Sequence, residues 1–355
     1  MKKLSYIIIT VFLSLIILEI GFSLIFYFKD QSVQAINLPC TKDTPYLYYS
    51  FLPSNTDRIS QNTDGFLTNS PIEKKDSSIY RIALIGGSVA EHLGAEKDSA
   101  NQFVLQKELN TILRTNNIEI IDAGTSAYVV EQEFLLIQLI LQKYKPDLII
   151  GLHGYNDLSS FKFNRYVNNQ ILLPPLNYRD FLVIEQGKRN NQFISRFTSL
   201  FKNTYRAYDF VKRYFTKQNT YDYSSVTNQT YEAYSNQYIT IINDIKDFSQ
   251  SKGIKYYDFL QPIRYYNNQS ENYLLSHDEV IQMTKMYHAF EEKQTKLNFA
   301  FSLSHLFDTH LNVYTDDCHV TPEGNSILAK AIASQLKNII EVDSVYRKKK
   351  NSFSL

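Results

Sequence analysis

Apolar and polar residues alternate along the chain in a way that predicts short buried strands separated by amphipathic helices. Three apolar runs are closed by glycine or a turn and have the length of strands: Arg81–Ile85, Ile118–Asp122 and Asp147–Leu152. The segments between them, Ser99–Arg114 and Val129–Lys143, carry apolar residues at helical spacing. Strands that are apolar throughout are typical of a parallel sheet covered on both faces. We therefore expect an α/β fold.

The second half of the chain resumes this alternation after an interruption. Tyr231–Ser251 has helical spacing, Gly253–Leu260 predicts a fourth strand, and Asn325–Val342 predicts the last helix. A further helical stretch is followed by residues 306–314, which lead into a loop. Residues 159–230 are rich in Asn, Tyr, Arg and Phe without regular spacing, so we interpret them as an insertion or lid over one face of the sheet.

The first thirty residues differ from the rest of the chain. Lys2 and Lys3 precede Leu4–Phe28, an apolar stretch whose only charge is Glu19. As a helix this stretch would span ~37 Å, enough to cross a bilayer with some tilt. The two lysines favour a cytoplasmic N-terminus and place the remaining chain outside, in the periplasm or at the cell surface. The alternative is a cleaved signal peptide, but no small-x-small cleavage site follows the apolar run. We therefore expect residues 1–30 to form a single-pass, uncleaved transmembrane anchor.

The regions that flank the predicted domain are polar. Residues 31–79 are rich in turn residues, which predicts a juxtamembrane spacer with Tyr46–Phe51 as a candidate strand. The main domain would then span residues 80–342, and residues 343–355 would form a basic tail, which we expect to be frayed and solvated. The formal net charge is +1, from 37 basic and 36 acidic residues. This balance disfavours a nucleic-acid partner, which would require a clustered basic surface.

The cysteines and the glycine turn bear on cofactors. Cys40 and Cys318 are compatible with one disulfide in an exported domain, but their sequence separation does not show whether they meet. They lack the C-x-x-C spacing of a structural zinc site. The turn after the first strand lacks both G-x-G-x-x-G and a P-loop lysine, which disfavours a nucleotide. We expect neither a metal nor a cofactor.

Polar residues follow the predicted strand ends, where ligands bind in open parallel sheets. Acyl transfer requires a nucleophile, a base, a group that orients the base, and donors for the oxyanion. Ser88 lies on a glycine turn after the first strand, and we assign it as the nucleophile. His319 and Asp316, three residues apart, are assigned as the base and its orienting carboxylate. The backbone N–H groups of Ser88 and Gly124 and the side chain of Asn156 are assigned to the oxyanion hole.

Several neighbouring residues have competing interpretations. Ser126 also follows a strand and is a rival nucleophile; neither serine completes the G-x-S-x-G elbow, which disfavours a conventional α/β-hydrolase. His92 and His153 either line the site or are histidines satisfied by hydrogen bonds elsewhere, and we favour the latter. Tyr155 either stacks on a sugar ring or fills space. Asp317 is a second carboxylate, one residue nearer the histidine.

These segments resemble the four sequence blocks of the SGNH (GDSL-type) hydrolase family. Ile82–Ala90 looks like the block that carries the nucleophile, and Asp122–Gly124 looks like the second block. Gly154–Asp157 is similar to the third block and Tyr314–Asn325 to the last, with its Asp-x-x-His. The sequence departs from the commonest motif at Gly87, where the family has Asp. Because that Asp is not a member of the triad, the departure bears on the subgroup more than on activity.

The resemblance covers about residues 80–158 and 231–336. It implies a three-layer α/β/α sandwich with a flavodoxin-like parallel sheet, and Ser-His-Asp chemistry without a cofactor, through an acyl-enzyme on Ser88. The spacing of the family motif favours Asp316 over Asp317.

The predicted location and the resemblance together define a substrate class. A membrane-anchored, bacterial-type member facing outward would be an esterase for an acyl ester, foremost acetyl, of an envelope glycan or lipid. With a sugar hydroxyl as acceptor, the same triad would make an O-acyltransferase acting on a polysaccharide. The alternative of another class is a non-catalytic, membrane-tethered binding or scaffold protein that retains the fold. The complete set of catalytic parts argues against that alternative.

Overall fold

The computed structural model describes residues 6, 41–44, 47–51, 54–55, 60–67, 75–95, 103–162, 166–167, 170–171, 228–266, 277–309 and 311–352. The chain divides into two units, and all described residues except Tyr6 belong to the unit formed by Pro39–Leu173 and Tyr223–Leu355.

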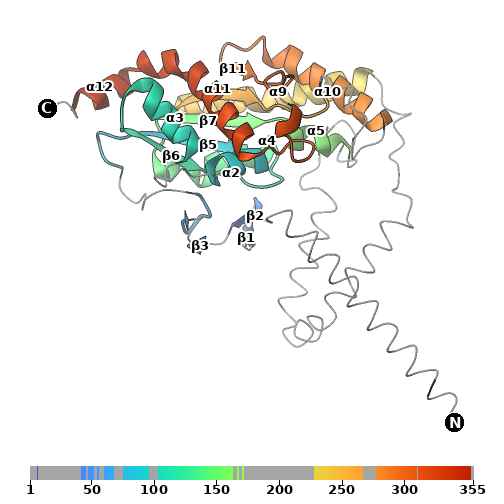
Figure 1. Cartoon of the computed structure of the whole chain (residues 1–355), viewed down its shortest axis with the longest axis horizontal. Helices are drawn as coiled ribbons and strands as arrows, with labels where there is room; N and C mark the ends of the chain where they lie inside the picture. Colours follow the sequence, from blue (N-terminus) through green and yellow to red (C-terminus); the bar gives the residue numbers. More distant parts are fainter. Residues whose placement is uncertain are drawn as a thin grey trace. The chain divides into compact units, whose positions relative to one another are not determined.

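A parallel five-stranded sheet forms the centre of the domain (Figure 1). Its strands lie in the order β11–β10–β7–β5–β6. Their bounds are β5 Tyr80–Gly86, β6 Ile118–Asp122, β7 Leu148–His153, β10 Lys255–Leu260 and β11 Ala300–Ser302. Read by position in the chain, this is the strand order of flavodoxin-like folds. The predicted α/β fold with a parallel sheet is thus confirmed.

Helices pack around the sheet in two groups. One group contains α2 (Ser88–Ala95), α3 (Val104–Leu113) and α11 (Pro322–Glu341). The other contains α4 (Val130–Leu139), α9 (Asn228–Ser251) and α10 (His277–Gln294), with α5 (Tyr155–Lys162) packed against α10. Right-handed crossovers in this strand order place the two groups on opposite faces of the sheet. The arrangement is therefore that of a three-layer α/β/α sandwich.

Several short elements complete the described part of the chain. Two 3₁₀ helices, η1 and η3, span Leu141–Tyr144 and Leu311–Val313. Three two-stranded antiparallel pairs are formed by β1 (Thr41–Thr44) with β2 (Tyr48–Phe51), β3 (Ser54–Asn55) with β4 (Ser60–Gln61), and β8 (Tyr166–Val167) with β9 (Gln170–Ile171). Within the region predicted as an insertion, residues 163–165, 168–169 and 172–227 lie outside the described residues.

The core follows from the apolar pattern of the sequence. Every residue of β5 and β7 is buried, as continuous apolar runs predict. Helix α11 begins where Thr321 caps it by accepting a hydrogen bond from the Gly324 N–H, with Pro322 as the first helical residue. Its apolar stripe is buried along the whole helix, at Leu328, Ala329, Ile332, Ala333, Leu336 and Ile340. Each fully buried Leu or Ile side chain stabilises the fold by ~1.5–3 kcal/mol.

The fifth strand, β11, was not predicted from the sequence. It has three residues, all half-buried, and it pairs only with β10 at the edge of the sheet. An edge strand this short carries no continuous apolar run, because one of its sides has no neighbouring strand to bury it.

The segment predicted as a spacer contributes to the domain. Leu67 and Asp122 exchange backbone hydrogen bonds, which extends the sheet locally beside the end of β6. Leu47, Phe66 and Leu67 are buried. These positions pack onto the domain, and β2 (Tyr48–Phe51) lies within the candidate strand Tyr46–Phe51. The role of residues 31–79 as a spacer stays a prediction.

The basic tail is a helix for most of its length, so the expectation of a frayed tail is wrong there. Helix α12 spans Ser344–Ser352. The Tyr80 hydroxyl donates to Asp343 Oδ2 at 2.6 Å, just before the helix, and the ring of Tyr346 meets that of Tyr80 edge-on. Lys349 Nζ lies 2.8 Å from Asp147 Oδ2. The basic side chains thus have specific partners at the amino-terminal edge of the sheet.

Within the described residues, none of the helices combines the length and the apolar character needed to cross a bilayer. The predicted anchor, Leu4–Phe28, lies outside those residues apart from Tyr6.

A buried ionic cluster lies beneath the carboxyl end of β7. The side chain of His153 is inaccessible and forms ion pairs with Glu133 through Nδ1 and with Asp258 through Nε2, the latter at 2.9 Å. The Tyr256 hydroxyl and the Gln294 amide also donate to Asp258. Burial acts to lower the pKa of His153, but the two carboxylates outweigh it and raise that pKa well above its ordinary value. His153 is therefore a core cation, in agreement with its interpretation as a satisfied histidine.

Replacing His153 by Ala should strongly destabilise the fold. The substitution leaves Glu133 and Asp258 in the core without their shared counter-charge, and breaking a buried ion pair in this way typically costs ~3–5 kcal/mol. The free energy of unfolding from urea titration checks this. His305→Ala is the matched control, because its side chain is 59% exposed and its ion pairs, with Asp308 and Glu291, lie outside the core cluster. Equal effects of the two substitutions would contradict the prediction.

Candidate active site

The carboxyl end of β5 presents Ser88 at the start of a helix. Ser88 is the first residue of α2, so its N–H belongs to the group that has no acceptor within the helix. The loop that follows β6 runs beside this turn, because Thr125 N–H donates to the Gly86 carbonyl at 2.9 Å. Ser88 itself is half-buried at the carboxyl end of the sheet.

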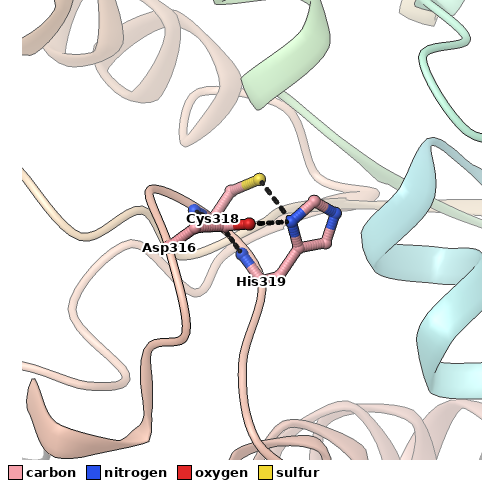
Figure 2. Close-up of side chains that lie close together, drawn as sticks. All are labelled: Asp316, Cys318 and His319. Carbon is pink, nitrogen blue, oxygen red and sulfur yellow. Dashed lines mark hydrogen bonds and ion pairs between the residues drawn. The ribbon is translucent and has the colours of Figure 1, made fainter. Parts of the chain in front are cut away.

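Asp316 and His319 come from one tight turn before α11, shown in Figure 2. Asp316 Oδ1 accepts the N–H groups of Cys318 and His319, at 2.9 and 2.8 Å. These bonds fix the carboxylate so that its other oxygen, Oδ2, lies 2.6 Å from His319 Nδ1. The opposite ring nitrogen, Nε2, lies 2.7 Å from Ser88 Oγ. A continuous hydrogen-bonded chain therefore runs from the serine through the imidazole to the carboxylate.

A carboxylate and a second histidine lie next to the His319 ring. Burial acts to raise the pKa of Asp316, but the hydrogen bonds from the His319 ring and the two backbone N–H groups lower it to about 2. His92, one turn after Ser88 on α2, stacks on His319 with ring centroids 4.7 Å apart. Burial, together with the nearby His319, lowers the pKa of His92 to about 4. At neutral pH, His319 therefore lies between a carboxylate and an uncharged ring.

Asp317 and Tyr155 have structural roles beside this turn. The Tyr155 hydroxyl donates to Asp317 Oδ2 at 3.2 Å, and the Asp317 carbonyl accepts the Arg264 N–H at 2.9 Å. It is Asp316 whose carboxylate contacts the His319 ring, as the family spacing suggested. Tyr155 is half-buried and is bonded to the turn through Asp317.

Cys318 adds a third potential ligand atom to Asp316 and His319 (Figure 2). Its Sγ lies 3.8 Å from His319 Nδ1, and it is a free, buried cysteine; Cys40 lies outside the described residues. Metal binding by cysteine requires the thiolate. Burial, reinforced by Asp316 and Asp317, raises the pKa of Cys318 well above its usual value. The neutral thiol and the bonds already made by Asp316 fit an acid–base turn better than a cation site.

Gly87 and Asn156 are in direct contact. Asn156 lies in the first turn of α5, and its Nδ2 donates to the Tyr128 carbonyl at 2.9 Å. A Cβ on Gly87 would lie 2.0 Å from Asn156 Nδ2 and 3.5 Å from the Tyr128 carbonyl oxygen. Glycine at this position therefore lets the Asn156 amide approach the nucleophile turn closely.

The structure gives the Gly124 N–H a different partner from the predicted oxyanion. It donates to Asp122 Oδ1 at 2.7 Å. A Cβ on Gly124 would lie 2.5 Å from the Glu91 backbone nitrogen and 2.9 Å from the Ala90 carbonyl carbon. Glycine is required here by the close packing of the loop on α2, so its presence in the sequence is explained without a role as a donor.

Ala127, which sequence reasoning missed, has an unusual backbone conformation in this loop. It has φ = +62°, a left-handed conformation that is uncommon for residues with a Cβ. Among the hydrogen bonds of the described residues, none has the Ala127 N–H as its donor. Its neighbour Tyr128 contacts both Gly87 and Asn156. Nothing in an Ala-Tyr pair signals this conformation, so the sequence alone could not identify it.

The rival nucleophile Ser126 is bonded to a carboxylate and not to a histidine. Glu91 Oε2 accepts the Ser126 hydroxyl at 2.5 Å and its N–H at 3.0 Å. Activation of a serine for acyl transfer requires a base that can take its proton in a suitable pose. The imidazole that fills this role in the structure is paired with Ser88.

Solved structures with similar folds include hydrolases. A GDSL-like lipase from Bacteroides thetaiotaomicron is 11% identical, with a TM-score of 0.39, over 75% of this chain and 92% of that chain. A variant of an acetyl xylan esterase from Geobacillus stearothermophilus is 14% identical, with a TM-score of 0.40, over 73% and 96%. No curated protein matches the chain.

A family model described as GDSL-like lipase/acylhydrolase matches residues 47–332, which is most of the chain. The protein therefore belongs to the GDSL-like lipase/acylhydrolase family, as the resemblance to the SGNH (GDSL-type) blocks indicated, and it is an ester hydrolase. The match begins at Leu47, which agrees with the burial of that residue in the domain.

Gly87→Ala should impair catalysis with little effect on folding. The new Cβ meets only the end of the Asn156 side chain, which can rotate away, but the amide then leaves the nucleophile turn. If Asn156 is an oxyanion donor, as the sequence predicts, kcat should fall toward that of Asn156→Ala, and loss of one such donor costs ~10²–10³-fold. Ester turnover and the melting temperature of both variants provide the measurement.

A double-substitution cycle tests whether this effect operates through Asn156. Because Gly87→Ala acts by displacing the amide, adding it to Asn156→Ala should reduce kcat no further. Additive losses, or full activity of Gly87→Ala, would contradict the inferred contact.

Proposed function

We propose that the protein is a serine esterase in which Ser88 is the nucleophile, His319 the general base and Asp316 the group that orients the imidazole. The supporting observation is the hydrogen-bonded chain through these residues, with contacts of 2.7 and 2.6 Å on the two sides of the ring. Nucleophile, base and orienting group are each within hydrogen-bond reach of the next, which is the geometry that activates a serine.

In this proposal Ser88 Oγ forms a bond to the ester carbonyl carbon while its proton moves to His319 Nε2. The tetrahedral intermediate then breaks its bond to the alcohol oxygen, which takes the proton from Nε2. Water attacks the remaining acyl-enzyme, gives its proton to the same nitrogen, and the serine oxygen leaves with that proton. Asp316, ionised because its pKa is about 2, stabilises the imidazolium in both steps.

We assign the oxyanion hole to the Ser88 N–H, the Ala127 N–H and the Asn156 amide. Ala127 takes the place first given to Gly124, whose N–H donates to Asp122. Contacts of Gly87 with Asn156 and Tyr128 support this grouping, because they bring the three donors around one turn. Fixed donors of this kind stabilise charge that develops on the carbonyl oxygen.

We also propose that the substrate is an acyl ester, foremost acetyl, of an envelope glycan or lipid. This part rests on the sequence: Leu4–Phe28 would anchor the chain, with the N-terminus in the cytoplasm and the catalytic domain outside. An extracytoplasmic enzyme held at the membrane would meet polymers and lipids of the envelope.

Labelling with a fluorophosphonate tests the nucleophile. The full-length chain should form a single adduct on Ser88, located by mass spectrometry, because the chemistry requires a serine activated by an imidazole. His319→Ala should lose the adduct and the turnover of p-nitrophenyl acetate together. Ser126→Ala is the matched control and should still be labelled. An adduct on Ser126, or none on folded protein, would overturn the assignment.

Membrane fractionation tests the proposed anchor. The full-length chain should remain in the membrane pellet after an alkaline carbonate wash, because ~25 apolar residues insert stably in a bilayer. Added protease should degrade the domain only from the extracytoplasmic side. Deletion of residues 1–30 should release the protein. A soluble product shortened at its N-terminus would instead establish a cleaved signal peptide.

A further inference from the structure

Glu91 is a buried carboxylate that the catalytic steps do not use. It lies on α2 three residues after Ser88 and is 3% exposed. Its Oε2 alone accepts two hydrogen bonds from Ser126, one from the hydroxyl at 2.5 Å and one from the backbone N–H at 3.0 Å. The loop after β6 is therefore tied to the helix that begins with the nucleophile.

The tied loop is the one that presents Ala127. Gly124 packs directly on the backbone of Glu91 at one end of this loop, and Ser126 is bonded to the Glu91 side chain at the other. Ala127 follows immediately, in a left-handed conformation that is disfavoured for a residue with a Cβ and must be maintained by its surroundings. The Tyr128 N–H closes this turn on the Thr125 carbonyl at 3.0 Å, and the two bonds from Ser126 to Glu91 tie the turn to α2.

We propose that Glu91 is a positioning residue, whose carboxylate holds the Ser126–Ala127 peptide against α2 so that the Ala127 N–H faces the oxyanion. The inference rests on the proposed function, since it acts through an oxyanion donor of that mechanism. An ionised oxygen is suited to this task because charge-assisted hydrogen bonds are about twice as strong as neutral ones.

The pKa of Glu91 lies close to neutral pH. Burial raises its pKa to about 7, against the opposing effect of the two hydrogen bonds from Ser126 and of the nearby His319. The other titratable groups around this point are His92, which stacks on His319, Asp316 on the far side of that ring, and Asp122, which bonds the Gly124 N–H. Below about pH 7 Glu91 is protonated, and its hold on the loop weakens.

Three variants of the full-length chain distinguish the positioning role of Glu91 from a general effect on folding. Glu91→Ala removes the acceptor and should lower kcat for p-nitrophenyl acetate by about tenfold or more, with KM within about twofold, because the lost interaction acts in the transition state. Glu91→Gln keeps a neutral oxygen acceptor, like the protonated carboxyl group, and should recover only part of kcat. Ser126→Ala removes one of the two bonds and should be intermediate. Glu292→Ala, an exposed carboxylate on α10, is the matched control and should match the wild type.

The pH dependence of activity is a measurement that a purely structural role of Glu91 would leave unchanged. In the wild type, activity should fall as pH drops below about 7, because Glu91 gains a proton and its hold on the loop weakens. Glu91→Gln should remove this step. Its melting temperature should also exceed that of the wild type at pH 8, since a raised pKa means that the ionised carboxylate disfavours the fold as pH rises through 7.

The outcomes distinguish this inference from the proposed function. If Ser88→Ala is inactive but Glu91→Ala keeps kcat within about twofold of the wild type, the positioning role is wrong and the mechanism stands. An active Ser88→Ala would overturn the mechanism itself. If Glu91→Ala fails to fold, the other two variants decide. An unchanged kcat in Ser126→Ala together with an unchanged pH profile in Glu91→Gln would refute the positioning role of Glu91.

Discussion

The candidate site depends on how closely the start of α2 approaches the segments that follow β6 and β7. Gly87 leaves space for the Asn156 amide, and Gly124 leaves space for the backbone of α2 itself. A Cβ on Gly124 would force the loop and α2 apart, a shift that protein interiors tolerate poorly, whereas a Cβ on Gly87 would displace only the Asn156 side chain. Close approach brings together donors from three separate elements around one turn. This condition is steric, and it does not depend on charge or on hydrogen bonds.

Two buried carboxylate arrangements near this edge illustrate different uses of charge. Glu133 and Asp258 enclose His153, so their charge is compensated within the core and the cluster ties β7, β10 and α4 together. Glu91 is held instead by two hydrogen bonds from Ser126, and burial raises its pKa to about 7. A carboxylate kept at a stability penalty beside a reactive group is typical of functional sites. The first arrangement supports the fold, and the second acts on the loop that carries Ala127.

The imidazole of His319 is positioned by local and by distant contacts. Its turn is self-contained, because Asp316 bonds two backbone N–H groups of the same turn as well as the ring. Its reach to Ser88, 231 residues away in the chain, depends on the whole sheet and on the packing of α11 against α2 and α3. The neutral ring of His92 then lies against the histidine without adding a charge that would compete with the proton. Family membership agrees with this arrangement, since GDSL-like acylhydrolases act on esters.

Local patterns in the sequence were sufficient for the α/β class, for four of the five strands, and for Ser88, Asn156, Asp316 and His319 as members of one site. These features depend on apolar periodicity and on motifs only a few residues long. Tertiary structure alone decided the rest. The half-exposed strand β11, the docked helix α12 and the burial of Phe66 and Leu67 depend on long-range partners and leave no periodic trace. The hydrogen bond from the Gly124 N–H to Asp122 and the left-handed conformation of Ala127 likewise depend on contacts around the backbone, which a sequence of side chains does not specify.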